Sequence, residues 1–236
     1  MHNNKSFIYS FLHGWLGTGL LTSNGDKWHR RRKLLTPAFH FNILQPFVDI
    51  FNKETDNLVE DLLQSCNEEY IDVVKPITEF TLFSIGETSL GVNLKEKDSI
   101  SYKQAIHKYG QLIPDRVVNP LLYSDFIYSK TKYHKQMKNV INILHDFSTN
   151  IIKERKEQKN TIEKSGISYS ERKRLALLDL LLDKGLEDEE IREEIDTFIF
   201  EGHDTTSMAL CYALVTLANE QKYQVGESYY LLIKTK

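Results

Sequence analysis

The sequence has little cysteine and no long apolar run. Its two cysteines, Cys66 and Cys211, stand far apart, and neither has a second cysteine close by. This spacing excludes a disulfide framework and a zinc site of the usual pattern, so we expect two free, buried thiols. The longest apolar stretch, Met208–Ala218, is far shorter than the ~20 residues that a membrane-spanning helix needs. The chain by itself, which shows no anchor segment, is therefore expected to be soluble or peripheral.

An excess of either charge is also missing. The formal net charge is -3, with 41% hydrophobic and 27% charged residues. These are ordinary values for a globular protein, so they indicate neither wholesale disorder nor a nucleic-acid-binding protein. The chain is long enough for one sizeable core.

Alternating strand patterns are scarce, and the periodicity is helical nearly everywhere, which predicts a mainly α fold. Helices are predicted over Lys27–Leu35, Phe47–Leu63, Pro76–Leu90, Ser99–Val118, a long segment around Met137–Ile151, Leu175–Leu182 and Asp188–Glu220. We expect Pro114 and Pro120 to break the helix over Ser99–Val118, and a charged, mobile connector over Lys153–Arg174.

The last predicted helix is unusually long. At 1.5 Å per residue, Asp188–Glu220 spans roughly 50 Å, well above an average helix of about 11–12 residues. Asp188 is a candidate N-cap, and acidic residues crowd the first turns, where the positive end of the helix dipole favours them. A helix of this length is expected to cross the whole domain.

A polar segment interrupts this helix. Gly202 in a helix interior costs about 1 kcal/mol relative to alanine, which suggests local opening or a close approach by another group. At 100° per residue, Glu201, Asp204, Thr205 and Met208 share one face, so two carboxyl groups and a hydroxyl lie together among apolar turns. A hydrated or paired polar patch is the simplest interpretation, and a functional site is the alternative.

The hexapeptide Glu201–Thr206 resembles the oxygen-activating motif of the long central helix of cytochromes P-450, and the glutamate in first position is similar to family 4. By this resemblance, Thr205 and Asp204 would be catalytic and deliver protons through water to dioxygen at the haem iron. Gly202 would open the groove for dioxygen, and Glu201 would form an ester with a haem methyl group.

The basic segment Lys27–Lys33 contains a second candidate site. Trp28 and Arg32 stand at i and i+4 and therefore meet on one side of a helix, where an indole N–H and a guanidinium suit a carboxylate. A solvated charged face is the alternative. The segment resembles the family-4 helix whose tryptophan and arginine bind a haem propionate. The remaining cations of the helix are expected to face an acidic reductase: Lys27, Arg30, Arg31 and Lys33.

The resemblance covers about Phe11 to Glu220, so we expect a partial cytochrome P-450 domain over 1–224 and a tail outside the family pattern over 225–236. It implies a haem-dependent monooxygenase that hydroxylates fatty acids or related lipophilic substrates. An NADPH-cytochrome reductase would be its partner, and the cytosolic face of the endoplasmic reticulum membrane its location.

No cysteine-containing haem-ligand loop occurs in the sequence, so no axial metal ligand is assigned to this chain. Cys211 lies on the long helix itself, and Cys66 stands in a polar context. The chain alone is therefore expected to be inactive, with part of its haem pocket open and apolar faces uncovered. The other hypotheses are a non-catalytic helical remnant that at most binds a partner and an unrelated helical scaffold.

Overall fold

The computed structural model describes residues 4–94, 99–164 and 176–225. Within these ranges every regular element is helical, in agreement with the predicted mainly α fold. The tail over 226–236 and part of the connector expected over Lys153–Arg174 lie outside the described residues.

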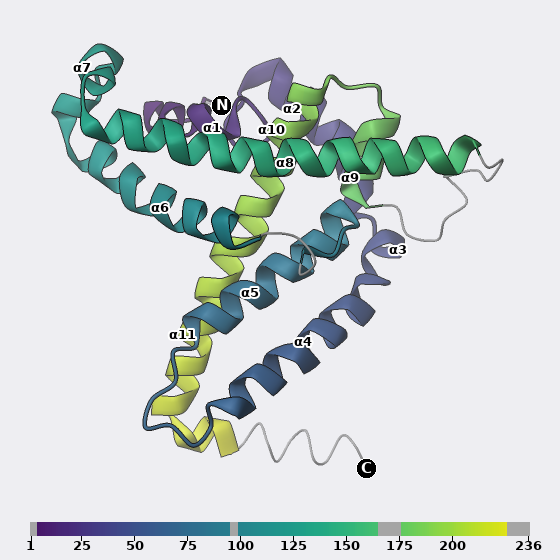
Figure 1. The fold of residues 1–236 in the computed structure, drawn as a ribbon, viewed down its shortest axis with the longest axis vertical. Coiled ribbons are helices and arrows are strands. Elements are labelled where there is room, and N and C mark those ends of the chain that lie inside the picture. Colours follow the sequence, from purple (N-terminus) through teal and green to yellow (C-terminus); the bar gives the residue numbers. More distant parts are fainter. Residues whose placement is uncertain (1–3, 95–98, 165–175, 226–236) are drawn as a thin grey trace.

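The molecule is organised around the predicted long helix. Helix α10 (Asp188–Phe200), a π-helical turn (Glu201–Thr205) and α11 (Thr206–Asn219) follow one another without a break, and we call this continuous segment the rod. Figure 1 shows α8 (Lys132–Lys164) crossing the upper part of the rod, while α4 (Phe47–Gln64) and α5 (Val74–Ile85) run beside its lower part.

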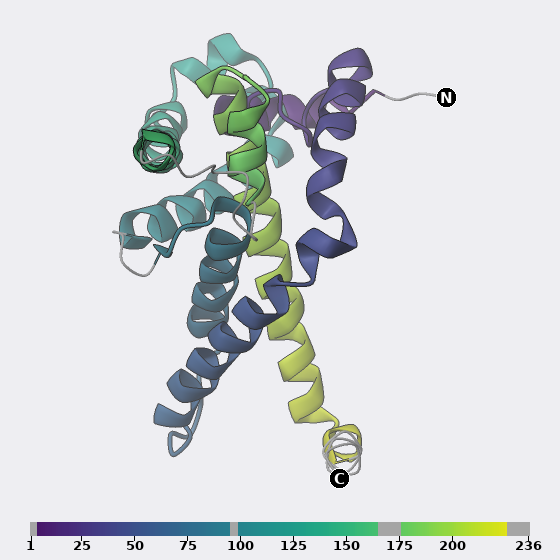
Figure 2. The ribbon, with the colours of Figure 1, turned by 90° about the vertical axis from the view of Figure 1, so that its right-hand side faces the viewer.

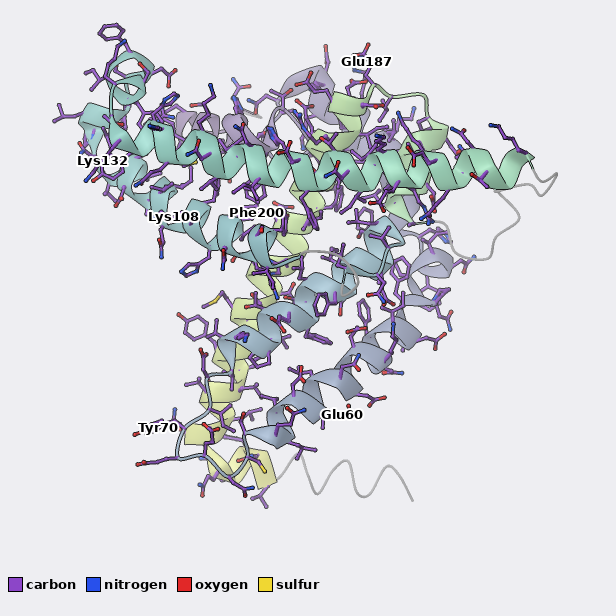
Figure 3. The ribbon with its side chains drawn as sticks, viewed as in Figure 1. Glu60, Tyr70, Lys108, Lys132, Glu187 and Phe200 are labelled. Atoms are coloured by element: carbon purple, nitrogen blue, oxygen red, sulfur yellow. The ribbon has the colours of Figure 1, made fainter. Side chains whose placement is uncertain are left out.

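The core lies where α6 (Ser99–Val118), α8 and α10 meet. Trp15 of α1 (His13–Leu16) is almost fully buried there, with its ring centroid 4.6 Å from that of Tyr109 and 5.1 Å from that of Phe200. Figure 3 shows Phe200 just below α8 and beside the end of α6 nearest the rod, well below Glu187 at the start of the rod. Ile191 and Ile195 of α10 are also buried in this core. The other α-helices of the described residues are α2 (Gly25–Leu35), α3 (Phe41–Leu44), α7 (Asp125–Ser129) and α9 (Leu177–Asp183), and a second π-helical turn (Gly86–Leu90) follows α5.

The expected break at Pro114 is wrong, because α6 continues through it to Val118. Leu112 and Arg116 are buried on either side of the proline. Their packing outweighs the lost backbone hydrogen bond, which is the usual way in which tertiary contacts override local preference.

The predicted start of the connector, at Lys153, is also too early, because α8 extends to Lys164. Arg155 makes two hydrogen bonds of 2.8 Å to the buried carboxylate of Asp179 at the start of α9. Further along α8, Lys156 pairs with Asp188 and Lys159 with Asp183. The charged residues therefore attach the end of α8 to the helices that follow it.

Two smaller expectations need correction. Cys211 is buried as expected, but Cys66 is exposed just beyond α4. The N-cap of α10 is Glu187 rather than Asp188, and the Glu187 amide donates a 3.3 Å hydrogen bond to Glu190 Oε2.

Candidate haem-facing site

The rod opens at the polar segment that the sequence singles out. Residues Glu201–Thr205 form a π-helical turn, the wider helical geometry that often occurs at functional sites. The Thr205 hydroxyl donates a 2.5 Å hydrogen bond to the Glu201 carbonyl, and the Ser207 hydroxyl donates a 2.8 Å bond to the Asp204 carbonyl. Local opening of the helix is therefore confirmed.

The predicted shared face is present and turned toward solvent. Glu201, Asp204, Thr205 and Met208 are all exposed, whereas His203 on the opposite side of the turn is buried. Partial burial raises the pKa of Glu201, and the charge of nearby Lys5 lowers it in part. The exposed face thus carries two carboxyl groups and one hydroxyl group beside the apolar thioether of Met208.

Gly202 has a packing partner that the sequence does not reveal. A Cβ at this position would lie 2.8 Å from Ile85 Cδ1 on α5. The glycine therefore allows α5 to pack directly against the π-helical turn. Whether it also opens a groove for dioxygen remains the prediction made from the family resemblance.

Trp28 and Arg32 lie side by side on α2, as their spacing predicts. The Arg32 guanidinium carbon is 6.0 Å from the Trp28 ring centroid, Arg32 is exposed and Trp28 is half-buried. Within the described ranges no ion pair is formed by Arg32. The guanidinium is therefore accessible to a carboxylate ligand.

Two of the cations assigned to a reductase surface have other partners, so that part of the expectation is wrong. Lys27 Nζ lies 3.0 Å from Glu193 Oε2, and Arg31 pairs with Glu190 and lies 3.5 Å from Glu194 Oε1. Arg31 is buried. These two side chains attach α2 to the rod, and only Arg30, Arg32 and Lys33 of the basic segment remain exposed cations.

A ring contact and a charge interaction relate the region of α2 to the exposed face of the rod. The Phe39 ring, in the turn that follows α2, stacks on the Phe198 ring at a centroid distance of 5.5 Å. The Lys5 amide donates a 2.6 Å hydrogen bond to Asn24 Oδ1 at the start of α2, and the charge of Lys5 acts on Glu201. Figure 2 shows α2 and α3 on one side of the rod, with α6 and α8 on the other.

Three buried titratable groups were not identified from the sequence. Burial raises the pKa of Glu194 to about 7 and that of Asp196 to about 8, and it lowers the pKa of His203 to about 4. The i, i+4 spacing of Lys27 and Arg31 could have indicated an acidic partner helix. No sequence signal marks Asp196 or His203 as buried.

A cavity of about 450 Å³ lies between α6, α7 and α8. Its walls combine the apolar side chains of Phe11, Ile113 and Met137 with Arg116 and Tyr128. Tyr128 is almost fully buried, and its hydroxyl has no hydrogen-bond partner among the described residues. A larger cavity of about 610 Å³ between α4 and α8 contains none of the predicted site residues.

Comparison with known proteins gives the family. The sequence model of the cytochrome P450 family matches residues 2–225. The chain is 40% identical to cytochrome P450 4c3 of Drosophila melanogaster, 41% identical to cytochrome P450 4V2 of Homo sapiens and 38% identical to cytochrome P450 4c21 of Blattella germanica, in each case over 94% of this chain. The chain belongs to the cytochrome P450 family, and these relatives place it in family 4. It spans about half the length of the curated relatives it matches, namely 45% or 46% of each.

The cofactor of this family is haem, and the exposed residues suit one side of it. The Arg32 guanidinium is available for a propionate, while Glu201 presents a carboxyl with a raised pKa on an open face that also carries Met208. Neither cysteine suits the iron: Cys211 is buried on the rod, and Cys66 is exposed just beyond α4.

The part of the chain that the structure describes has no cluster of His, Cys, Asp or Glu suited to a metal ion. Within the same ranges, no helix has both the length and the apolarity needed to cross a bilayer.

Proposed function

We propose that this chain forms one side of the haem pocket of a family-4 monooxygenase that hydroxylates fatty acids or related lipophilic molecules. The observation that carries the proposal is the exposed face of the π-helical turn, with α2 beside it. Glu201, Asp204 and Thr205 face solvent together, and the stacking of Phe39 on Phe198 brings the α2 region to the same side.

Each site residue has a task that its surroundings allow. Trp28 and Arg32 would bind a propionate, because they combine an indole donor with an exposed guanidinium. Glu201 would tether the cofactor, and partial burial raises the pKa of its carboxyl. Asp204 and Thr205 would hold and pass protons on the exposed face. The haem, when bound, supplies the chemistry that inserts one oxygen atom into a C–H bond.

A lipophilic substrate is what the family resemblance implies, and the exposed thioether of Met208, on the face shared with Thr205, offers it an apolar contact on the haem-facing side. The cavity of about 450 Å³ between α6, α7 and α8 lies on the other side of the rod from α2 (Figure 2), so it is not assigned to the substrate. We place the protein on the cytosolic face of the endoplasmic reticulum membrane, as the family resemblance implies.

An NADPH-cytochrome reductase would supply electrons. The remaining exposed cations of α2, Arg30 and Lys33, are the part of the basic segment available to an acidic partner. Charge reversal at both positions should slow electron delivery at low ionic strength and have little effect at high salt. Equal rates for the variant and the native sequence at low salt would exclude this surface.

The alternative is a helical remnant that at most binds a partner. The exposed apolar side chains of α11, including Tyr212 and Val215, favour this alternative because they offer a binding surface. We expect hemin to bind this chain, and we expect the reduced complex with carbon monoxide to lack the thiolate-type Soret band. A thiolate-type band would contradict the assignment of no axial cysteine, and the absence of any hemin binding would favour the remnant.

A further inference from the structure

The joint between α2 and the rod depends on two adjacent glutamates of α10. Glu194 is fully buried, accepts a 3.1 Å hydrogen bond from the Leu20 amide and lies 3.5 Å from Arg31 Nε. Glu193 accepts a 2.8 Å hydrogen bond from the Thr18 amide. One carboxylate pair thus contacts both the segment that precedes α2 and the cations of α2.

The segment before α2 sits directly on the rod. A Cβ at Gly17 would lie 2.3 Å from Glu193 Oε1, and a Cβ at Gly19 would lie 2.9 Å from the Glu193 carbonyl oxygen. Burial would raise the pKa of Glu193, but the Thr18 amide and the Lys27 ammonium outweigh it, so the pKa falls. The charged form of Glu193 is therefore the one that the joint stabilises.

Helical geometry relates this joint to the candidate haem-facing residues. Lys27 and Arg31 are four residues apart and point toward α10, while Trp28 and Arg32 are each one residue further, which turns them by about 100° around α2. On the rod, Glu194 and Glu201 are seven residues apart, so they lie within about 20° of one another. The joint and the exposed face therefore occupy the same side of the rod.

We propose that Glu193 and Glu194 are positioning residues that, through Lys27 and Arg31, hold α2 at the orientation in which Trp28 and Arg32 face the same space as Glu201. The role given to Trp28 and Arg32 rests on the proposed function. The placement of α2 does not, because it is a property of the chain without cofactor.

The test measures the placement of α2 directly. Nitroxide labels are attached through His29→Cys on α2 and Ala209→Cys on α11, both exposed, in a Cys66→Ser, Cys211→Ala background. Pulsed EPR then gives the distance distribution between the labels. The pair Lys27→Leu and Arg31→Leu should at least double the width of this distribution, and the pair Glu193→Leu and Glu194→Leu should do the same.

The matched control removes two cations of the same helix that are exposed and form no ion pair within the described ranges, through Arg30→Leu and Lys33→Leu. It should leave the width unchanged, while circular dichroism confirms that each variant remains folded. An unchanged width in the folded Lys27→Leu, Arg31→Leu pair, or equal broadening in the control, would overturn the proposal. If either double variant fails to fold, the single change Lys27→Gln should still broaden the distribution, to a smaller extent, and an unchanged width there would likewise overturn it.

The same proteins are finally titrated with hemin, with the Soret absorbance as the readout. If the native sequence does not bind hemin, the proposed function fails, but the distance measurement still decides whether the glutamates position α2. If hemin binds, its affinity should fall at least tenfold in the Lys27→Leu, Arg31→Leu pair and stay unchanged in the control. Unchanged affinity in that pair would overturn the link between the joint and the haem-facing residues.

Discussion

Gly202 of the π-helical turn lies directly against Ile85 of α5, because a Cβ on the glycine would come within 2.8 Å of Ile85 Cδ1. Replacing Gly202 with alanine should cost about 1–3 kcal/mol through overpacking, offset by the roughly 1 kcal/mol that alanine gains over glycine in a helix interior, so the net change should destabilise the chain by up to about 2 kcal/mol. Urea unfolding followed by circular dichroism measures this change.

Gly110 is the matched control for this substitution. It lies within α6, and a Cβ there would meet no atom within 4 Å. Gly110→Ala should stabilise the chain by roughly 0.5–1 kcal/mol, since alanine is the better helix former. Equal effects of the two substitutions would show that α5 does not pack closely against the turn.

Asp196 should make the chain less stable as the pH rises. Burial raises its pKa in the folded state to about 8 from the usual 3.8, although Ser148, Arg192 and Trp15 lower it in part. The folded chain thus retains a proton that the unfolded chain releases, so the contribution of Asp196 to the free energy of unfolding is greatest below about pH 4 and is lost between about pH 4 and pH 8. The lost stability amounts to roughly 1.4 kcal/mol for each unit by which the pKa is raised. Because asparagine does not titrate, Asp196→Asn should abolish this pH-dependent loss.

Unfolding free energies measured from pH 5 to pH 8 test this prediction. The exposed Asp115 on α6 serves as the control, and Asp115→Asn should keep the pH dependence of the native sequence. If Asp196→Asn and the native sequence lose stability in parallel as the pH rises, the buried carboxyl is not the cause.

His203 should make the chain less stable as the pH falls, which is the reverse of the effect of Asp196. It is 2% exposed, neither ring nitrogen has a hydrogen-bond partner among the described residues, and burial lowers its pKa from 6.5 to about 4. The unfolded chain therefore binds a proton more readily than the folded chain, and stability is lost as the pH falls from about 6.5 to about 4. His203→Leu should reduce this acid-induced loss. Thermal melts at pH 4.5 and pH 7 would show the same loss in both proteins if the ring were accessible to water.

Breaking the ion pair between Arg155 and Asp179 should lower the free energy of unfolding substantially. Two hydrogen bonds of 2.8 Å join them, and the side chain of Asp179 is 1% exposed. Removing only the arginine, in Arg155→Met, should cost about 3–5 kcal/mol because it leaves a buried carboxylate without its main cation. The double variant Arg155→Met, Asp179→Leu should recover much of that loss. Additive losses in urea unfolding of the three variants would contradict this coupling.

The helices follow closely from sequence periodicity, and the interruption at Gly202 correctly predicts the place where the rod opens. The two errors at Pro114 and after Lys153 have a common cause. In both segments a helix that is locally unfavourable continues because distant partners stabilise it, through the burial of Leu112 and the pairing of Arg155 with Asp179. No pattern within the segment contains that information.

The candidate site shows a similar limit. The spacing of Trp28 and Arg32 correctly predicts that they are neighbours, since helical geometry alone sets it. That Lys27 and Arg31 point to the rod instead of a partner protein depends on where α10 lies in three dimensions. The same holds for Asp196, whose burial only the assembled core produces.

The central claim is that the exposed face of the π-helical turn and the α2 region surround one haem. The most direct measurement is the broadening of backbone amide NMR signals by the iron of added hemin. We predict strong broadening at Glu201 and Thr205 together with Trp28 and Arg32, and sharp signals at Tyr70 in the segment between α4 and α5, far from both (Figure 3). Broadening that spares either α2 or the turn, or that centres on Tyr70, would contradict the account.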